Sequence, residues 1–232
     1  DIIDNKYFLE NANFIKSKEN YYRAKLGLPK YYFFVSCRLI KKKNLMFLID
    51  TYSKFVVKNK NWHLVIAGDG ILLKELKELT IKLKIGNMIT FLGYVQYNEI
   101  PYYYSLSSCF ILPSVREQWG LVVNEALACG IPVIVSNRCG SAFELVENNK
   151  VGYTFDPYDQ SDLLDKMNKI INQDTRSQFS KNSFEIISKY NLSNFGENLK
   201  KASEHALLNF NNNHSIISKI ILNLLIIFNR IR

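Results

Sequence analysis

Cysteine and histidine, the residues that most often hold transition metals, are few in this chain and are not clustered. No two cysteines are separated by only two residues, and three of the four lie in or beside apolar runs. The three histidines have no partner at the spacing of a metal site. These absences argue against a disulfide framework and lead us to expect no metal site. They predict reduced, buried thiols, as in a cytoplasmic protein, at Cys37, Cys109, Cys129 and Cys139.

Several motifs that identify nucleotide-binding and hydrolytic enzymes are also missing. No Gly-x-Gly-x-x-Gly follows a predicted strand, and there is neither a Walker phosphate loop nor a Gly-x-Ser-x-Gly elbow. The sequence therefore offers no support for the enzyme classes that depend on these loops.

Acidic residues are outnumbered, because 21 Asp and Glu stand against 30 Lys and Arg and give a net charge of +9. A basic excess favours anionic partners such as nucleic acid, acidic lipid or phosphorylated small molecules. The alternative is that the many Lys, Asn, Ile and Tyr residues reflect a biased base composition of the gene. The basic and aromatic stretch RSQFSKNSFE (176–185) contains no recognisable nucleic-acid motif, so we expect no nucleic-acid partner.

What the chain does contain is a regular alternation of short apolar runs with longer amphipathic segments from residue 31 onward. The apolar runs predict buried strands at 31–37, 62–68, 88–93, 108–113, 131–136 and 152–156. Helical periodicity predicts helices at 45–56, 72–83, 120–129, from about 159, and at 193–209. Ser141 and Glu144 have the spacing of a capping box, which predicts a further short helix. The predicted fold class is α/β, a doubly wound parallel sheet of Rossmann type.

This alternation divides the chain into four segments. Residues 1–30 are predicted to be a linker and a leading helix, and residues 31–190 an α/β domain. A helix is expected at 191–210, followed by an apolar, amphipathic tail at 211–232. The tail falls short of the roughly 20 apolar residues that span a bilayer. Two alternatives stay open for it: packing against another domain, or lying in the surface of an acidic membrane.

Two acids occur where a doubly wound sheet binds its ligand, beyond the carboxyl ends of the strands. Glu117 precedes the helix predicted at 120–129, and Glu125 lies eight positions later. Between them, the amides of Gly120, Leu121 and Val122 begin the helix and attract a phosphate. Because carboxylates bind vicinal hydroxyls, the pattern fits a diol–diphosphate–diol ligand such as a nucleoside diphosphate sugar. The alternative is that the acids only complement the helix dipole.

Two basic residues follow the first predicted strand. Arg38 comes directly after it, and Lys43 lies five residues later, near the start of the next helix. Both can reach the same crevice and neutralise a diphosphate. The alternative is that this stretch, RLIKKK, is a solvated basic loop.

The order of several stretches resembles a known family. In this sequence they are SCRLIKKKN, HLVIAGDG, ITFLGYV, EQWGLVVNEALACGIPVIVSNRCGSAFELV and VGYTFDPYD. Together they resemble the retaining glycosyltransferases of GT-B fold, in particular the bacterial glycan-assembly branch (family 4-like) with a Glu-x7-Glu signature. The resemblance covers about residues 1–175 and is most specific at 117–146. Cys37 and Asn44 stand where the family usually has glycine, and neither change removes a functional side chain.

The resemblance implies a role for each residue around the predicted helix start. Glu117 matches the acid that holds hydroxyls of the donor sugar, and Glu125 matches the acid on the nucleotide ribose. Gly120 with Leu121 and Val122 matches the helix start whose amides bind the sugar and the diphosphate.

The resemblance also implies a reaction. Arg38 and Lys43 match the basic pair that stabilises the leaving diphosphate, so that with Glu117 they are the predicted catalytic residues. Transfer would retain the configuration of the anomeric carbon, with the leaving diphosphate deprotonating the incoming hydroxyl on the same face. No cofactor and no metal are expected, and the Asp-x-Asp pair that holds a metal in the other large architecture of nucleotide-sugar enzymes does not occur.

Members of this family have two similar α/β domains, and this sequence resembles only the C-terminal domain of the GT-B fold. The opening DIIDNKYF resembles the junction that follows the first domain. The chain is thus expected to be either a fragment or one half of a two-chain enzyme. Its expected partners are a nucleotide-sugar donor, a glycan or lipid-linked acceptor, and the missing N-terminal acceptor domain. The expected location is the cytoplasm, with peripheral contact at the inner face of the membrane through the tail.

Two other functions stay open at this point. One is a non-catalytic nucleotide-sugar-binding subunit that works only with a separate acceptor-binding chain. The other is a hydrolysing epimerase of the same architecture, which would need acid and base groups that are not evident in this sequence.

Overall fold

The computed structural model describes residues 2–147 and 150–208. One compact unit reaches Asn191, and a second unit begins at Leu192. The described part of the second unit is the helix α9 (Leu192–Leu208), close to the helix predicted at 193–209. The predicted tail at 211–232 lies outside the described residues. Within the described ranges, no helix is long and apolar enough to cross a membrane.

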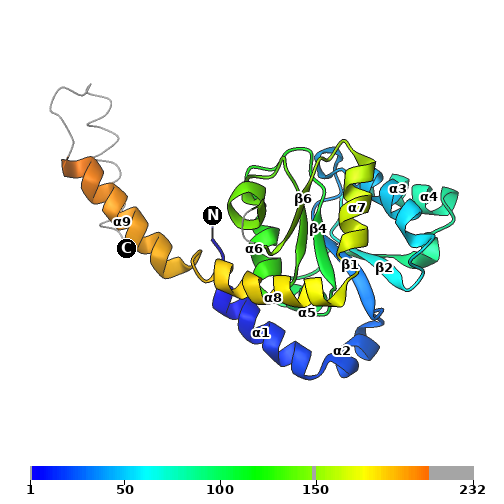
Figure 1. The fold of residues 1–232 in the computed structure, drawn as a ribbon, viewed down its shortest axis with the longest axis horizontal. Helices are drawn as coiled ribbons and strands as arrows, with labels where there is room; N and C mark the ends of the chain where they lie inside the picture. Colours follow the sequence, from blue (N-terminus) through cyan, green and yellow to red (C-terminus); the bar gives the residue numbers. More distant parts are fainter. Residues whose placement is uncertain (1, 148–149, 209–232) are drawn as a thin grey trace. The chain divides into compact units, whose positions relative to one another are not determined.

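The first unit is built on one sheet of six parallel strands in the order β3-β2-β1-β4-β5-β6 (Figure 1). The strands are β1 (Tyr31–Ser36), β2 (Trp62–Ala67), β3 (Ile89–Gly93), β4 (Cys109–Leu112), β5 (Val133–Ser136) and β6 (Gly152–Phe155). Each lies inside its predicted range, so the prediction of a doubly wound parallel α/β sheet is confirmed. The short apolar runs located the strands correctly because a strand that is covered on both faces carries no polar side to interrupt the run.

Both faces of the sheet are covered by helices (Figure 1). One face carries α3 (Leu45–Val56), α4 (Leu73–Lys82) and α7 (Gln160–Lys169). The other carries α1 (Asn5–Ser17), α5 (Ile100–Ser105), α6 (Leu121–Ala128) and α8 (Gln173–Ile187). Strand β1 shows the alternation that this requires: Tyr32 and Phe34 enter one core, whereas Phe33 and Val35 enter the other.

The strand order reverses between β1 and β4, and these two strands pair only briefly. Their register contains Phe33 opposite Cys109 and Phe34 opposite Phe110, whereas β1 and β2 are in register along the whole of β1. The carboxyl ends of β1 and β4 therefore diverge. In a doubly wound sheet, this is where a ligand crevice forms.

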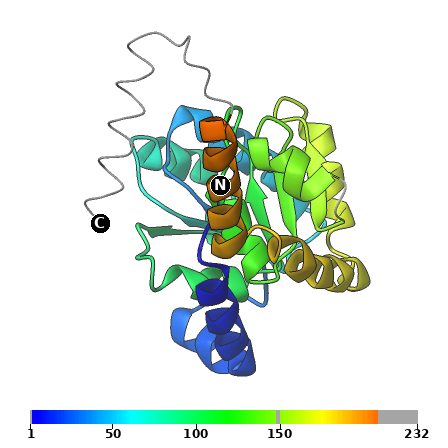
Figure 2. The same cartoon turned by 90° about the vertical axis from the view of Figure 1, so that its left-hand side faces the viewer.

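The first 30 residues form two helices, where we predicted a linker and one leading helix. Helix α1 packs on the α5 and α6 side and buries Phe8, Ala12 and Ile15, while α2 (Glu19–Leu26) ends at the left-handed Gly27. Figure 2 shows α1 in dark blue and α2 in a brighter blue at the edge of the unit. The buried stripe of α1 is narrow and lies among mostly polar residues, with Leu9 and Phe14 exposed, so the sequence shows no clear amphipathic pattern there.

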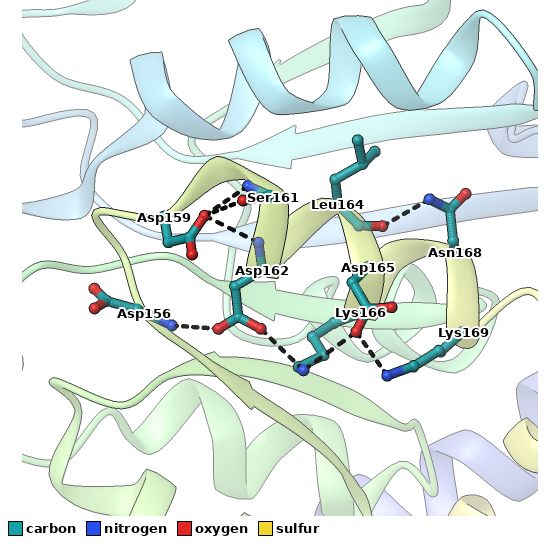
Figure 3. A network of polar contacts seen from close by, with 9 residues as sticks. All are labelled: Asp156, Asp159, Ser161, Asp162, Leu164, Asp165, Lys166, Asn168 and Lys169. Atoms are coloured by element: carbon teal, nitrogen blue, oxygen red, sulfur yellow. Dashed lines mark hydrogen bonds and ion pairs between the residues drawn. The ribbon is translucent and has the colours of Figure 1, made fainter.

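A polar network fixes the turn between β6 and α7 (Figure 3). The Asp159 carboxylate caps α7 by accepting from the backbone N–H groups of Ser161 and Asp162, at 2.8 and 3.2 Å. Asp162 accepts in turn from the backbone N–H of Asp156 at 2.9 Å and pairs with Lys166 at 2.9 Å. These bonds satisfy donors that the start of a helix leaves free.

The capping box predicted at Ser141 is not formed. The segment continues as the π-helix η3 (Ala142–Glu147), but the Ser141 Oγ atom is buried without a hydrogen-bond partner among the described residues. Ser141 lies instead beside Gly120 at the start of α6, where a Cβ atom would come within 3.5 Å of its Oγ. The short 3-10 turns η1 (Lys41–Lys43) and η2 (Gly86–Met88) complete the described elements.

The hydroxyl of Tyr52 is a structural anchor whose removal should cost stability. It donates towards the backbone carbonyls of Trp62 at 2.8 Å and Met88 at 3.0 Å from a fully buried ring. We expect Tyr52→Phe to lower the free energy of unfolding by about 1–2 kcal/mol, since both carbonyls lose a partner. Urea denaturation followed by tryptophan fluorescence measures this, with Tyr21→Phe, on an exposed ring, as the control. Equal midpoints for the two variants would contradict the anchoring role.

Candidate functional site

A crevice opens at the carboxyl edge of the sheet, where β1 and β4 diverge. It consists of two adjoining hollows, of about 370 and 260 Å³, that share Val122. The first is lined by residues at and just after the ends of β1, β2 and β3, with Ile100 and Val122, and the second by the loop before α6, the first residues of α6 and Lys43. We call the two hollows together the carboxyl-edge crevice. It brings together six of the predicted site residues: Arg38, Lys43, Glu117, Gly120, Leu121 and Val122.

Close backbone approach shapes the first hollow. Gly68, directly after β2, has φ 128°, and a Cβ atom there would lie 1.9 Å from the carbonyl oxygen of Cys37. Only glycine lets these two strand ends come so near. The Leu39 N–H donates to the Asp69 carbonyl at 2.9 Å, which ties the loop after β1 to the loop after β2.

Helix α6 begins in the second hollow without a side-chain cap. Its first flanking residue, Gly120, has φ 97°, and a Cβ atom there would lie 2.8 Å from the Leu112 side chain. The amides of the first turn, at Leu121 and Val122, therefore face the crevice with the positive end of the helix dipole. This is a favourable position for an anion.

Lys43 and Glu117 form an ion pair inside the second hollow, and both side chains are mostly buried. The loops that carry them are fixed by backbone bonds: the Val115 N–H donates to the Lys42 carbonyl at 3.0 Å, and the Glu117 N–H to the Arg138 carbonyl at 3.2 Å. From the sequence, these two side chains are expected to contact different parts of a ligand. The structure pairs them with each other.

Arg38 lies at the mouth of the first hollow and is exposed. It takes part in none of the ion pairs found in residues 2–147 and 150–208, although the Asp69 carboxylate lines the same hollow. Its neighbour Cys37 also lines this hollow, and burial raises the pKa of its thiol to about 12. Cys37 is therefore neutral and adds no negative charge to the site.

Glu125 lines neither hollow. It lies one turn after Val122 on the same side of α6, half-buried, and its Oε2 accepts a hydrogen bond from the Tyr104 hydroxyl at 2.8 Å. Burial raises the pKa of Glu125 to about 7, against the opposing effect of the Tyr104 bond. Tyr104 also reaches Ser36, which lines the first hollow. Glu125 thus forms part of the floor beneath the crevice, in contact with it through Tyr104.

Sequence reasoning missed Tyr104 and the buried Ser141. Tyr104 belongs to α5, a helix of only six residues that carries too few apolar positions for a periodic signal. Ser141 was interpreted as a helix cap, whereas its buried Oγ faces Gly120. The sequence did contain one sign of polar packing near this site, because Asn124 interrupts the apolar run of α6. In the structure Asn124 is fully buried and accepts a hydrogen bond from the Trp119 indole at 2.9 Å.

The crevice as a whole offers fixed positive polarity beside carboxylates. An uncapped helix start and Arg38 face outward, Lys43 is shared with Glu117, and Glu125 lies one turn below. Such a site can hold an anionic group between two hydroxyl-bearing ones. Across the described residues, no three potential metal-ligating side chains gather in one place.

Comparison with known proteins points to one family. The family model described as glycosyl transferases group 1 matches residues 18–186. An uncharacterized glycosyltransferase of Methanocaldococcus jannaschii is 33% identical over 115 residues, which cover 50% of this chain and 29% of the relative. The alpha-monoglucosyldiacylglycerol synthase of Acholeplasma laidlawii is 31% identical over 136 residues, covering 57% and 34% respectively. The chain therefore spans less than half the length of these curated relatives.

Solved structures show the same fold. The Anabaena protein Alr3699/HepE in complex with UDP superposes with a TM-score of 0.75 at 21% identity, covering 88% of this chain and 56% of that one. The C-terminal domain of a glycosyl transferase group 1 family protein (LpcC) from Francisella tularensis has a TM-score of 0.67 at 23% identity, covering 82% of this chain and 99% of that domain. Because the family model matches most of the chain, this protein belongs to the glycosyl transferases group 1 family, and its α/β domain is of GT-B type.

Proposed function

We propose that this chain is the donor-binding half of a retaining, metal-independent glycosyltransferase. It would transfer a sugar from a nucleoside diphosphate sugar to a glycan or lipid-linked acceptor. The observation that carries the proposal is the meeting of Arg38, the Lys43–Glu117 pair and the uncapped start of α6 in one crevice. Family membership supports the reaction class, and the UDP in the Anabaena complex supports UDP as the first probe.

The diphosphate would lie against the start of α6, between Arg38 and Lys43. Negative charge that builds on the departing diphosphate is then met by two cations and by fixed backbone dipoles. A phosphate that approaches Lys43 competes with Glu117 for the same ammonium group. Arrival of the diphosphate would thus release the Glu117 carboxylate to accept hydrogen bonds from the sugar hydroxyls, as a positioning group.

Glu125 would bind the ribose. Its pKa of about 7 means that the carboxylate is only partly ionised near neutral pH, because burial penalises the charge. Two ribose hydroxyls that donate to it would supply the hydrogen bonds that an ionised, half-buried carboxylate otherwise lacks. Tyr104 would remain as the third donor and hold the carboxylate in place.

A second candidate is a non-catalytic nucleotide-sugar-binding subunit that needs a separate acceptor-binding chain. Both candidates predict nucleotide binding by this chain. Sugar transfer by the chain within its full-length protein would exclude the subunit.

Replacing Glu125 tests the ribose assignment. At pH 8, where the carboxylate is ionised, we expect Glu125→Gln to weaken UDP binding about tenfold, because charge-assisted bonds to the ribose become neutral ones. Isothermal titration calorimetry in the presence of EDTA measures the affinity, with GDP and ADP as further probes. The control is Glu75→Gln, on the exposed face of α4. If both variants bind each nucleotide as the wild type does, Glu125 does not contact the ribose.

The same variant should alter the pH dependence of stability. The pKa of Glu125 rises from 4.5 to about 7 on folding. Between these two pH values the unfolded chain releases the proton more readily than the folded chain, so the wild type loses stability as the pH rises. Glu125→Gln does not titrate, so it should match the wild type near pH 4 and exceed it by about 3 kcal/mol at pH 8. Urea denaturation at both pH values measures the difference. A constant offset between the proteins would show that burial does not raise this pKa.

The ion pair allows a comparison of two variants that break the same contact. We expect Lys43→Met to weaken UDP binding, because the diphosphate loses a cation. Glu117→Gln frees that cation, so UDP affinity should be kept or strengthened, while the preference among UDP-sugars is lost. Calorimetry with UDP and with a panel of UDP-sugars measures both effects. Equal weakening of UDP binding by the two variants would indicate that the pair only stabilises the fold.

A further inference from the structure

A second cavity lies at the opposite edge of the sheet, where the proposed function uses no residue. It has a volume of about 560 Å³ and opens where Tyr31, Ser108 and Pro132 lead into or begin β1, β4 and β5. We call it the amino-edge cavity. Its charged lining consists of five cations and one carboxylate: Lys16, Arg23, Lys30, Arg176, Lys181 and Glu19.

Three of these cations are held in place by helix carboxyl ends. Lys16 Nζ donates to the Cys129 carbonyl at the end of α6 at 2.7 Å, and Arg23 Nη2 donates to the Leu106 carbonyl at the end of α5 at 2.7 Å. Arg176 Nη1 donates to the Ile170 carbonyl at the end of α7 at 2.8 Å. Each bond offsets the negative end of a helix and also fixes the position of the cation.

The positive charge of the cavity exceeds what these helix ends require. Three helix ends of at most about half a negative charge each, together with Glu19, leave an excess of at least about two charges. Lys30 and Lys181 supply this excess, since both are exposed and neither joins an ion pair within the described ranges. The Lys30 ammonium lies over the Tyr31 ring, 5.2 Å from its centroid, at the rim of the cavity.

The cavity also contains a buried hydroxyl without a strong hydrogen-bond partner among the described residues. Ser105 is only 4% exposed and lines the cavity, and its Oγ has no hydrogen-bond partner among the described residues. The neighbouring Cys129 thiol offers it only a weak contact, which slightly opposes the rise in the pKa of this thiol that burial causes. A buried hydroxyl without a partner costs stability unless a ligand or a water molecule supplies the bond. Further serines line the same wall: Ser107, Ser108, Ser177 and Ser180.

We propose that the amino-edge cavity binds the phosphate group of a small phosphorylated ligand. A phosphate carries up to two negative charges and several strong acceptors, which match the excess charge and the N–H and O–H donors of this wall. The cavity volume is within the range of small-molecule sites. Lys30 and Lys181 are exposed lining residues, so they would contact the ligand from the solvent side. A soluble phosphorylated compound and the headgroup of an acidic lipid share this chemistry, and the experiment below separates them.

The two tryptophans of the chain provide one reporter for each site. Trp62 stacks on Tyr31, with ring centroids 5.6 Å apart, and the Arg176 guanidinium lies 5.2 Å from the centre of its ring. Trp119 lines the carboxyl-edge crevice at the other end of the sheet. Their two indole N–H signals in a ¹H–¹⁵N spectrum therefore follow the two sites separately.

The test is a titration of the whole ¹⁵N-labelled chain with inorganic phosphate at constant ionic strength. We expect a saturable shift of the Trp62 indole signal, and at least a fivefold weaker affinity in the double variant Lys30→Ala/Lys181→Ala. The control, Lys74→Ala/Lys82→Ala on the exposed surface of α4, removes the same charge and should bind as the wild type does. Movement of the Trp119 signal alone, or equal loss in both double variants, would overturn the proposal.

Vesicle flotation distinguishes the two sources of phosphate. Vesicles of phosphatidylglycerol and of phosphatidylcholine are compared for the wild type and for both double variants. If only Lys30→Ala/Lys181→Ala reduces binding to the acidic vesicles, the ligand is a lipid headgroup. If the Trp62 shift saturates with phosphate and flotation is the same for all three proteins, the ligand is a soluble compound. Absence of both effects would refute the site.

Discussion

The polarity of helices around a parallel sheet is the constraint on which the rest of this structure depends. All six strands run in one direction, so the helices that return between them begin at the carboxyl edge and end at the amino edge. One edge therefore gathers helix starts, which attract anions, and the other gathers helix ends, which require cations. The uncapped start of α6 illustrates the first case, and the three cations bonded to the ends of α5, α6 and α7 illustrate the second.

Glu117 in the crevice and Glu125 beneath it both reduce the stability of the folded chain unless their charges are compensated. Glu117 is neutralised by Lys43, so its charge is compensated until another anion competes for the same lysine. Within the described part of the chain, Glu125 accepts a hydrogen bond from the Tyr104 hydroxyl and has no cation beside it, and because it is half-buried its ionised form is poorly solvated. Its raised pKa expresses that cost. Buried carboxylates that lack cations are rarely retained for stability, which is consistent with a ligand-binding role.

The sheet, its order of elements and the position of the crevice could be predicted from the sequence because strands covered on both faces leave continuous apolar runs. Short or polar elements could not: α5 has six residues, and α1 and α8 show mostly polar surfaces. The Lys43–Glu117 contact joins residues 74 positions apart and depends on how two loops meet, which no local pattern encodes. Asn44 illustrates a substitution that the structure explains, since its left-handed φ of 57° is one that asparagine, like glycine, adopts readily.

The central claim is that a nucleoside diphosphate lies against the start of α6. Chemical-shift mapping of the ¹⁵N-labelled chain with UDP tests it most directly, because the backbone amides of Leu121 and Val122 would donate to the phosphates. The account predicts saturable downfield shifts of these two amides, larger than those of amides elsewhere in the chain. Saturable UDP binding that leaves both amides unchanged, and instead shifts amides around Lys16 and Arg176, would contradict it.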